Sequence, residues 1–187
     1  RALPRLDLSG QRLDEAFESL EASAEPRGGI TRLVLALSAK CTLFASVFAS
    51  DRVAELGEAD LMDACAFAAT ARRRVGDALA EQGFGAMREA IAALLDAGDG
   101  DAALAAFCAH FPDDRRHRWV RDLGAEVLHF TAPDRFPLMT RWIWDARSGT
   151  GVLREIWHGE GVETIADDQA SHVALRAELA GYLKGRG

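Results

Sequence analysis

The stretch ITRLVLALSAKCTLFASVFAS, from Ile30 to Ser50, is the most apolar part of the chain and sets the expected fold class. Its periodicity predicts one long helix over residues 30–50. Apolar side chains fall nearly all round that helix, at Leu33, Val34, Leu37, Cys41, Phe44, Val47 and Phe48. A helix that is apolar on every side is usually buried on several sides. We therefore expect it to be the central core helix of an α-helical bundle.

The same stretch is too interrupted to predict a membrane span. Ser38, Lys40, Thr42 and Ser46 break it, whereas a span needs about 20 predominantly apolar residues. The sequence predicts a soluble protein that makes no membrane contact.

Amphipathic patterns and end signals predict further helices on both sides of this one. Ser9 or Asp14 can cap a first helix, Gly83 can end another, and Asp167-Asp168 can cap the last. The expected ranges are about 10–25, 58–83, 84–97, 101–111, 113–130 and a final helix after residue 168. Together they predict a mainly α fold, an irregular bundle of six or seven helices in a single domain over residues 1–187.

Charge argues against a nucleic-acid-binding function. The net charge is −7 over 187 residues, and an acidic protein repels phosphate at long range. Two basic clusters, Arg72–Arg74 and Arg115–Arg118, could together form a phosphate-binding face. The alternative is that they are solvated helix faces that make ion pairs. The predominance of arginine over lysine is typical of a GC-rich, bacterial genome.

Cysteine and histidine usage predicts neither disulfides nor a metal. The odd number of cysteines, three, indicates free thiols in a reducing compartment, and hence a cytoplasmic location. The cluster Cys108, His110, His117 and His129 fits no zinc spacing. The Gly149–Gly151 turn lacks the lysine and spacing of a phosphate-binding loop, so no cofactor is expected.

Residues 131–166 lack the helical periodicity of the preceding segments and are expected to form an irregular insert or edge segment of the domain. Pro133 and Pro137 exclude a regular helix there. Two β-friendly runs, 138–145 and 152–158, flank a Ser/Gly/Thr turn. They predict a β-hairpin, with a pair of short helices as the alternative.

This segment is also the expected binding surface, because it holds three of the four tryptophans among several arginines. Aromatic and arginine side chains are enriched where proteins bind their partners. The predicted binding residues are Arg135, Arg141, Trp142, Trp144, Arg154 and Trp157. The alternative is that the tryptophans pin an irregular segment to the bundle.

Two functions remain open from the sequence. The first is a non-enzymatic helical accessory protein that binds a protein partner through the Trp/Arg-rich segment, with homo-oligomerisation left open. The second is an enzyme or nucleic-acid-processing protein with a cleft around residues 129–145, in which His129, Asp134 and Asp145 are the candidate catalytic residues beside Arg141. Lys40 is a further candidate nucleophile or base, unless it snorkels or pairs with a carboxylate.

Overall fold

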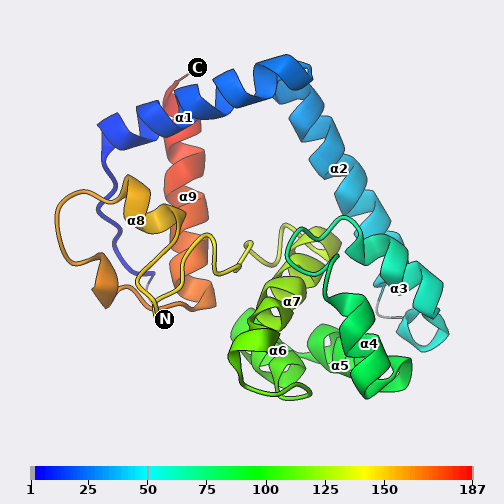
Figure 1. Ribbon diagram of the computed structural model, residues 1–187. Helices are drawn as coiled ribbons and strands as arrows, with labels where there is room; N and C mark the ends of the chain where they lie inside the picture. Colours follow the sequence, from blue (N-terminus) through cyan, green and yellow to red (C-terminus); the bar gives the residue numbers. More distant parts are fainter. Residues whose placement is uncertain (1–2, 50, 187) are drawn as a thin grey trace. The chain divides into compact units, whose positions relative to one another are not determined.

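The computed structural model describes residues 3–49 and 51–186, and in this part of the chain it is helical, with no strand beyond isolated bridges. The mainly α class is confirmed. The α-helices are α1 (Gly10–Ala24), α2 (Gly29–Val47), α3 (Glu58–Cys65), α4 (Val75–Gln82), α5 (Phe84–Asp96), α6 (Gly100–Cys108), α7 (Arg118–Thr131), α8 (Val152–Ile156) and α9 (Gln169–Gly185) (Figure 1). Short 3₁₀ turns lie at η1 (Glu25–Arg27), η2 (Val53–Glu55), η3 (Arg115–His117) and η4 (Val162–Thr164).

Two compact units divide the chain. The terminal unit consists of Arg1–Ala39 and Arg141–Gly187, and the central unit is the intervening Lys40–Thr140. Each has its own cluster of buried apolar side chains. The sequence predicts a single domain over residues 1–187. The division into two compact units does not show whether either unit folds alone, so the single domain stays a prediction.

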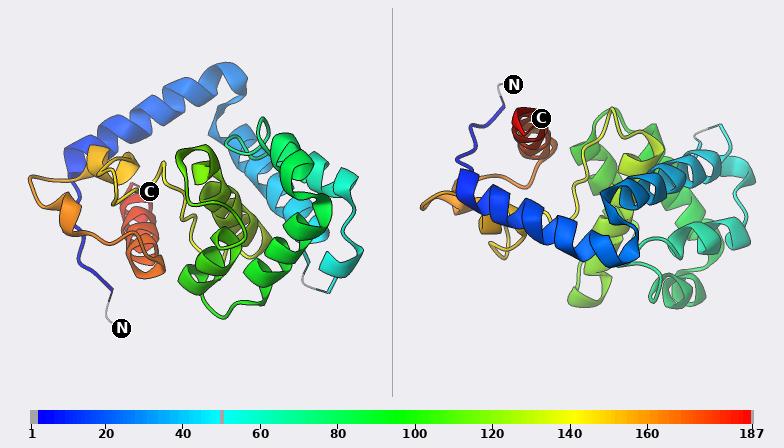
Figure 2. Two further views of the ribbon diagram at one scale, coloured as in Figure 1. Left: turned by 60° about the horizontal axis from the view of Figure 1, so that its bottom comes forward. Right: turned by 90° about the horizontal axis from the view of Figure 1, so that it is seen from above.

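The core of the central unit is built around α7, most of whose residues are buried. Helices α5 and α6 pack beside it (Figure 2). Gly124 explains how closely α6 approaches, because a Cβ there would lie 2.8 Å from a ring carbon of Phe107 and 3.0 Å from a methyl of Leu104. Any larger residue would push α6 away from α7, so the glycine allows the tight helix pair.

The predicted helix over 58–83 is wrong in its middle. The chain forms α3 and α4, and residues 66–74 make a succession of turns between them. Apolar residues continue at helical spacing through the gap, and Ala68 and Ala71 are buried. Periodicity therefore could not reveal the break. The predicted C-cap is confirmed: Gly83 ends α4 with a φ of 85°.

The terminal unit joins the two ends of the chain. Helices α1 and α9 cross, and there the Tyr182 hydroxyl and the Arg186 guanidinium donate to Asp14 at 2.5 and 2.6 Å (Figure 1). Ser9 and Asp168 cap α1 and α9 through their side chains, as the sequence predicts. Its core contains residues from both segments: Leu6, Leu13, Trp144, Leu153, Ile156, Trp157, Val162, Ile165, Ala174 and Leu175.

The predicted hairpin is not formed in the described residues. A single antiparallel bridge joins Asp145 to Thr150, and the short helix α8 follows instead of a second strand. Gly151 makes this change of direction possible. Its φ is 130°, and a Cβ there would lie 2.5 Å from the carbonyl oxygen of Ile143. A left-handed, crowded position of this kind favours glycine.

The predicted long helix is confirmed as α2, which ends at Val47, but the prediction that it is the buried central helix is wrong. Within α2 the only buried residue is Phe44, and the nine residues from Thr31 to Ala39 are all exposed. Of the helices in the described residues, α2 is long and apolar enough to cross a membrane by length and composition alone. Apolarity on all sides indicates that something covers a helix, but not what covers it.

Candidate functional site

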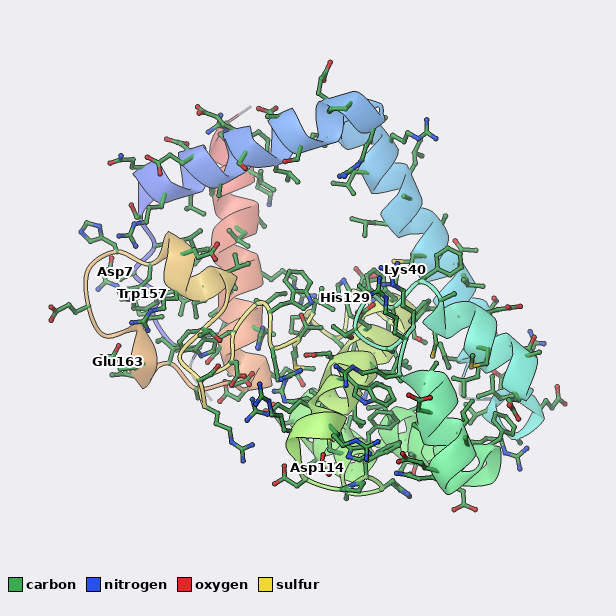
Figure 3. The ribbon with its side chains drawn as sticks, in the orientation of Figure 1. Asp7, Lys40, Asp114, His129, Trp157 and Glu163 are labelled. Atoms are coloured by element: carbon green, nitrogen blue, oxygen red, sulfur yellow. The ribbon has the colours of Figure 1, made fainter. Side chains whose placement is uncertain are left out.

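Two of the three tryptophans in the predicted binding segment are interior. Trp144 is 1% exposed, and its indole N–H donates to the carbonyl of Ile165 at 3.0 Å. Trp157 is also buried and donates to the carbonyl of Glu160; Figure 3 shows it beside α8. Both indoles have apolar surroundings and a satisfied donor, as buried tryptophans require. Their assignment to a binding surface is therefore wrong: they pin this segment to the terminal unit.

Trp142 is the remaining exposed indole. It is 52% exposed, and its carbonyl accepts a hydrogen bond from the N–H of Val152, which is itself exposed. Arg154 is exposed nearby in sequence and donates to the carbonyl of Gly149. The predicted Trp/Arg surface is thus reduced to a small patch around Trp142.

The other predicted binding residues belong to both units of the chain. Arg135 belongs to the central unit, while Arg141 and Arg154 belong to the terminal unit. Arg135 stacks on the Phe136 ring at 4.7 Å and donates to the carbonyl of Gly98 at 2.8 Å. Its guanidinium is therefore held in one place.

The candidate catalytic residues are engaged in structural contacts or exposed. His129 Nδ1 lies 2.8 Å from the carbonyl oxygen of Phe136, so Nδ1 carries the proton, because a carbonyl can only accept. Asp134 is exposed, and no hydrogen bond joins it to His129 in the described part of the chain. Asp145 accepts from the backbone N–H groups of Arg147 and Ser148 and closes the turn there. His129 and Asp145 thus each make a hydrogen bond that shapes the local backbone, and Asp134 is exposed.

Lys40 is paired with a carboxylate, which is the structural alternative to its candidate role as a nucleophile or base. Its ammonium donates to Glu126 of α7 at 2.5 Å and lies 3.9 Å from the centre of the Phe130 ring (Figure 3). The two side chains are 14% and 7% exposed. Burial raises the pKa of Glu126, while the bond to Lys40 opposes that rise. The pair fastens the second part of α2 to α7.

The cysteines are free thiols, as predicted. Burial, together with the charge of Glu126, raises the pKa of Cys65 to about 12. Burial also raises the pKa of Cys108. Thiolates are the reactive form, so these thiols behave as small apolar groups at neutral pH.

The structure brings the two arginine clusters together, as the phosphate-face hypothesis requires. Arg74 and Arg116 line one small pocket with His117. Acidic groups share this surface: Glu81 pairs with Arg116 at 3.0 Å, and Asp114 accepts from His117 at 2.8 Å. The bond from His117 holds the pKa of Asp114 below its usual value. This pairing supports the alternative of a solvated face with ion pairs.

Three features of the structure were not predicted from the sequence. The first is a buried His172–Asp167 contact of 3.2 Å in the terminal unit, which no motif indicates. The second is a pocket of about 520 Å³ in the central unit, lined by Arg135 and by small residues of α5. The sequence could not predict this pocket, because an alanine that lines a pocket has the same pattern in the sequence as one that packs in a core. The third is the exposed first part of α2, which the sequence assigned to the core.

The exposed part of α2 carries an ordered apolar stripe. Ile30, Leu33, Val34 and Leu37 have the spacing i, i+3, i+4, i+7 and share one helix face. Leu33, Val34 and Leu37 are 37, 53 and 45% exposed. The same face continues to Phe44 and Phe48, which are fully buried in the central unit. We call the first four residues the α2 stripe.

The described residues contain no group of three or more His, Cys, Asp or Glu side chains placed to hold a metal ion. Comparisons with protein-family models, with curated proteins and with solved structures find no match to this chain.

Proposed function

We propose that this protein is a non-enzymatic helical accessory protein that presents the α2 stripe to an apolar groove on a partner protein. The observation that carries the proposal is the unbroken exposure of Thr31–Ala39 in a strongly apolar helix. Several adjacent large apolar side chains in water are unfavourable, by about 25 cal/mol per Å² of apolar surface, and such patches mark interaction sites.

The spacing of the stripe supports the mode of binding. Helices that dock into grooves use anchors at i, i+3, i+4 and i+7, which are Ile30, Leu33, Val34 and Leu37 here. No charged residue lies within that set. Arg32 lies on the opposite side of the helix, near Leu35, so the groove that fits the stripe best is apolar.

Length argues against a lipid bilayer as the occupant. The part of α2 in the terminal unit, Gly29–Ala39, is about 16 Å long, whereas a membrane span needs about 30 Å. From Lys40 onward the helix is held by Glu126 and by Phe44 in the central unit.

A pair of leucine variants tests the proposal. Leu37 lies on the stripe and Leu35 lies about 160° round the helix, and both are exposed, at 45 and 64%. Leu37→Glu should weaken partner binding at least about tenfold, because it places a charge in the groove. Leu35→Glu is the matched control and should bind normally.

The partner is identified by photo-crosslinking from position 37 and then purified, and its affinity is measured by calorimetry for the wild type and both variants. Equal loss in Leu35→Glu and Leu37→Glu would count against a docked face. If the wild type dimerises in light scattering and Leu37→Glu does not, the occupant of the stripe is a second copy of the chain. If the wild type floats with anionic vesicles and Leu37→Glu does not, the occupant is a lipid surface.

A further inference from the structure

The pocket beside Arg135 is a second place where the chain can bind something, independent of the α2 stripe. It has a volume of about 520 Å³, lies in the central unit and is open to solvent on one side. Small-molecule sites usually occupy about 300–1,000 Å³. Its walls include Val53 of η2 and Ala92, Ala93 and Leu95 of α5. The short alanine side chains leave the space open, and the remaining lining residues, Asp96, Ala97, Gly98 and Arg135, give the pocket a largely polar surface.

One charged donor is already fixed at this pocket. The guanidinium of Arg135 rests on the buried Phe136 ring and donates through Nη2 to the carbonyl of Gly98. A guanidinium has five N–H donors, so others are left for a ligand. Because these contacts hold the side chain, a carboxylate that binds it loses less entropy than one that binds a mobile arginine.

The opposite charge is also present. The pocket lies at the C-terminal end of α5, where the last carbonyls form the negative end of the helix dipole. Asp96, the last residue of α5, is exposed and lines the same pocket. A positive group is favoured there, and a negative group is favoured at Arg135.

We propose that this pocket binds a small zwitterion, an amino acid or a dipeptide, with its carboxylate on Arg135 and its ammonium group on Asp96. The alanines that line the pocket leave room for a short apolar side chain. A ligand with only one of the two charges would leave Arg135 or Asp96 without its counter-charge, and each charge-assisted hydrogen bond contributes to affinity.

Titrations of the full chain with four probes test this proposal, followed by the chemical shifts of backbone amides. L-valine and the dipeptide Ala-Val carry both charges, isovalerate carries only the carboxylate, and isobutylamine only the ammonium group. At least one zwitterion should saturate the amides of residues 92–98, and the tighter zwitterion identifies the ligand size. Each single-charge probe should bind at least about tenfold more weakly.

Three variants complete the test. Arg135→Met should weaken zwitterion binding at least about tenfold, and Ala93→Phe should abolish it by filling the space without changing any charge. Arg118→Met removes an exposed arginine of the same unit that does not line the pocket, and should bind normally. Absence of saturable binding by both zwitterions, isovalerate binding as tightly as L-valine, or unchanged binding in Arg135→Met would overturn the proposal.

Discussion

The two parts of α2 have similar composition and opposite environments. Gly29–Ala39 is exposed from Thr31 onward, whereas the part beginning at Lys40 leads into Phe44 and Phe48, neither of which has any exposed surface. One helix thus serves as a core element at its end and as an open surface at its start. The difference teaches two things. An apolar composition favours burial of a helix, and the packing of the rest of the chain decides which of its residues are buried within the protein.

The largest expected effect on stability comes from truncating one large apolar side chain in each part of α2 to alanine and comparing the two losses. Phe44→Ala should lower the free energy of unfolding by about 3–5 kcal/mol, because it leaves a cavity in a fully buried site. Leu37→Ala should change it by less than about 0.5 kcal/mol, as for most surface positions. Urea unfolding of both variants measures the contrast. A large loss in Leu37→Ala would mean that the first part of α2 is covered in solution.

The boundary between the two parts can be tested at Lys40. Lys40→Met should cost about 2–3 kcal/mol, because it leaves the Glu126 carboxylate buried without its partner. The cost falls below that of a fully buried pair, since Lys40 keeps some exposure. The double variant Lys40→Met, Glu126→Leu should recover most of the loss, as measured by a double-mutant cycle in urea. Additive losses would show that the pair does not hold the helix.

The smallest expected effect concerns pH and Cys65, which packs in the core of the central unit. Its folded pKa of about 12 lies above the ordinary value of 9.0, so the folded state favours the protonated thiol. This contribution to stability is complete below pH 9 and is lost as the pH rises toward 12. At pH 10 the loss is about 1 kcal/mol.

Cys65→Ala removes that thiol, so its unfolding free energy should fall less between pH 8 and pH 10 than that of the wild type. Urea unfolding at the two pH values gives the comparison. Parallel pH dependences in the two proteins would contradict the burial of this thiol.

Local chemistry was readable from the sequence. Ser9 and Asp168 were predictable caps because an oxygen-bearing side chain before an amphipathic run satisfies nearby backbone N–H groups. Gly83 was predictable as the end of α4 for a similar local reason. The pairing of Lys40 with a carboxylate followed from the cost of burying a lone charge, although its partner did not.

Tertiary placement was not readable. Trp142 and Trp144 stand two residues apart in a segment without regular structure, and one is exposed while the other fills a core. No periodicity distinguishes them. The Arg135 pocket depends on the meeting of residues 92–98 with residue 135, and alanines that border a space look like any other alanines.

The order of the units along the chain has a consequence for biosynthesis. The terminal unit needs Leu6 and Leu13 to meet Trp144 and residues beyond it, whereas the central unit is one continuous segment. During synthesis, Lys40–Thr140 emerges in full before the second half of the terminal unit exists, and contacts distant in sequence form slowly. The nascent chain therefore carries the whole of Lys40–Thr140 while the thirty-nine residues of Arg1–Ala39 still lack the forty-seven residues that complete their unit.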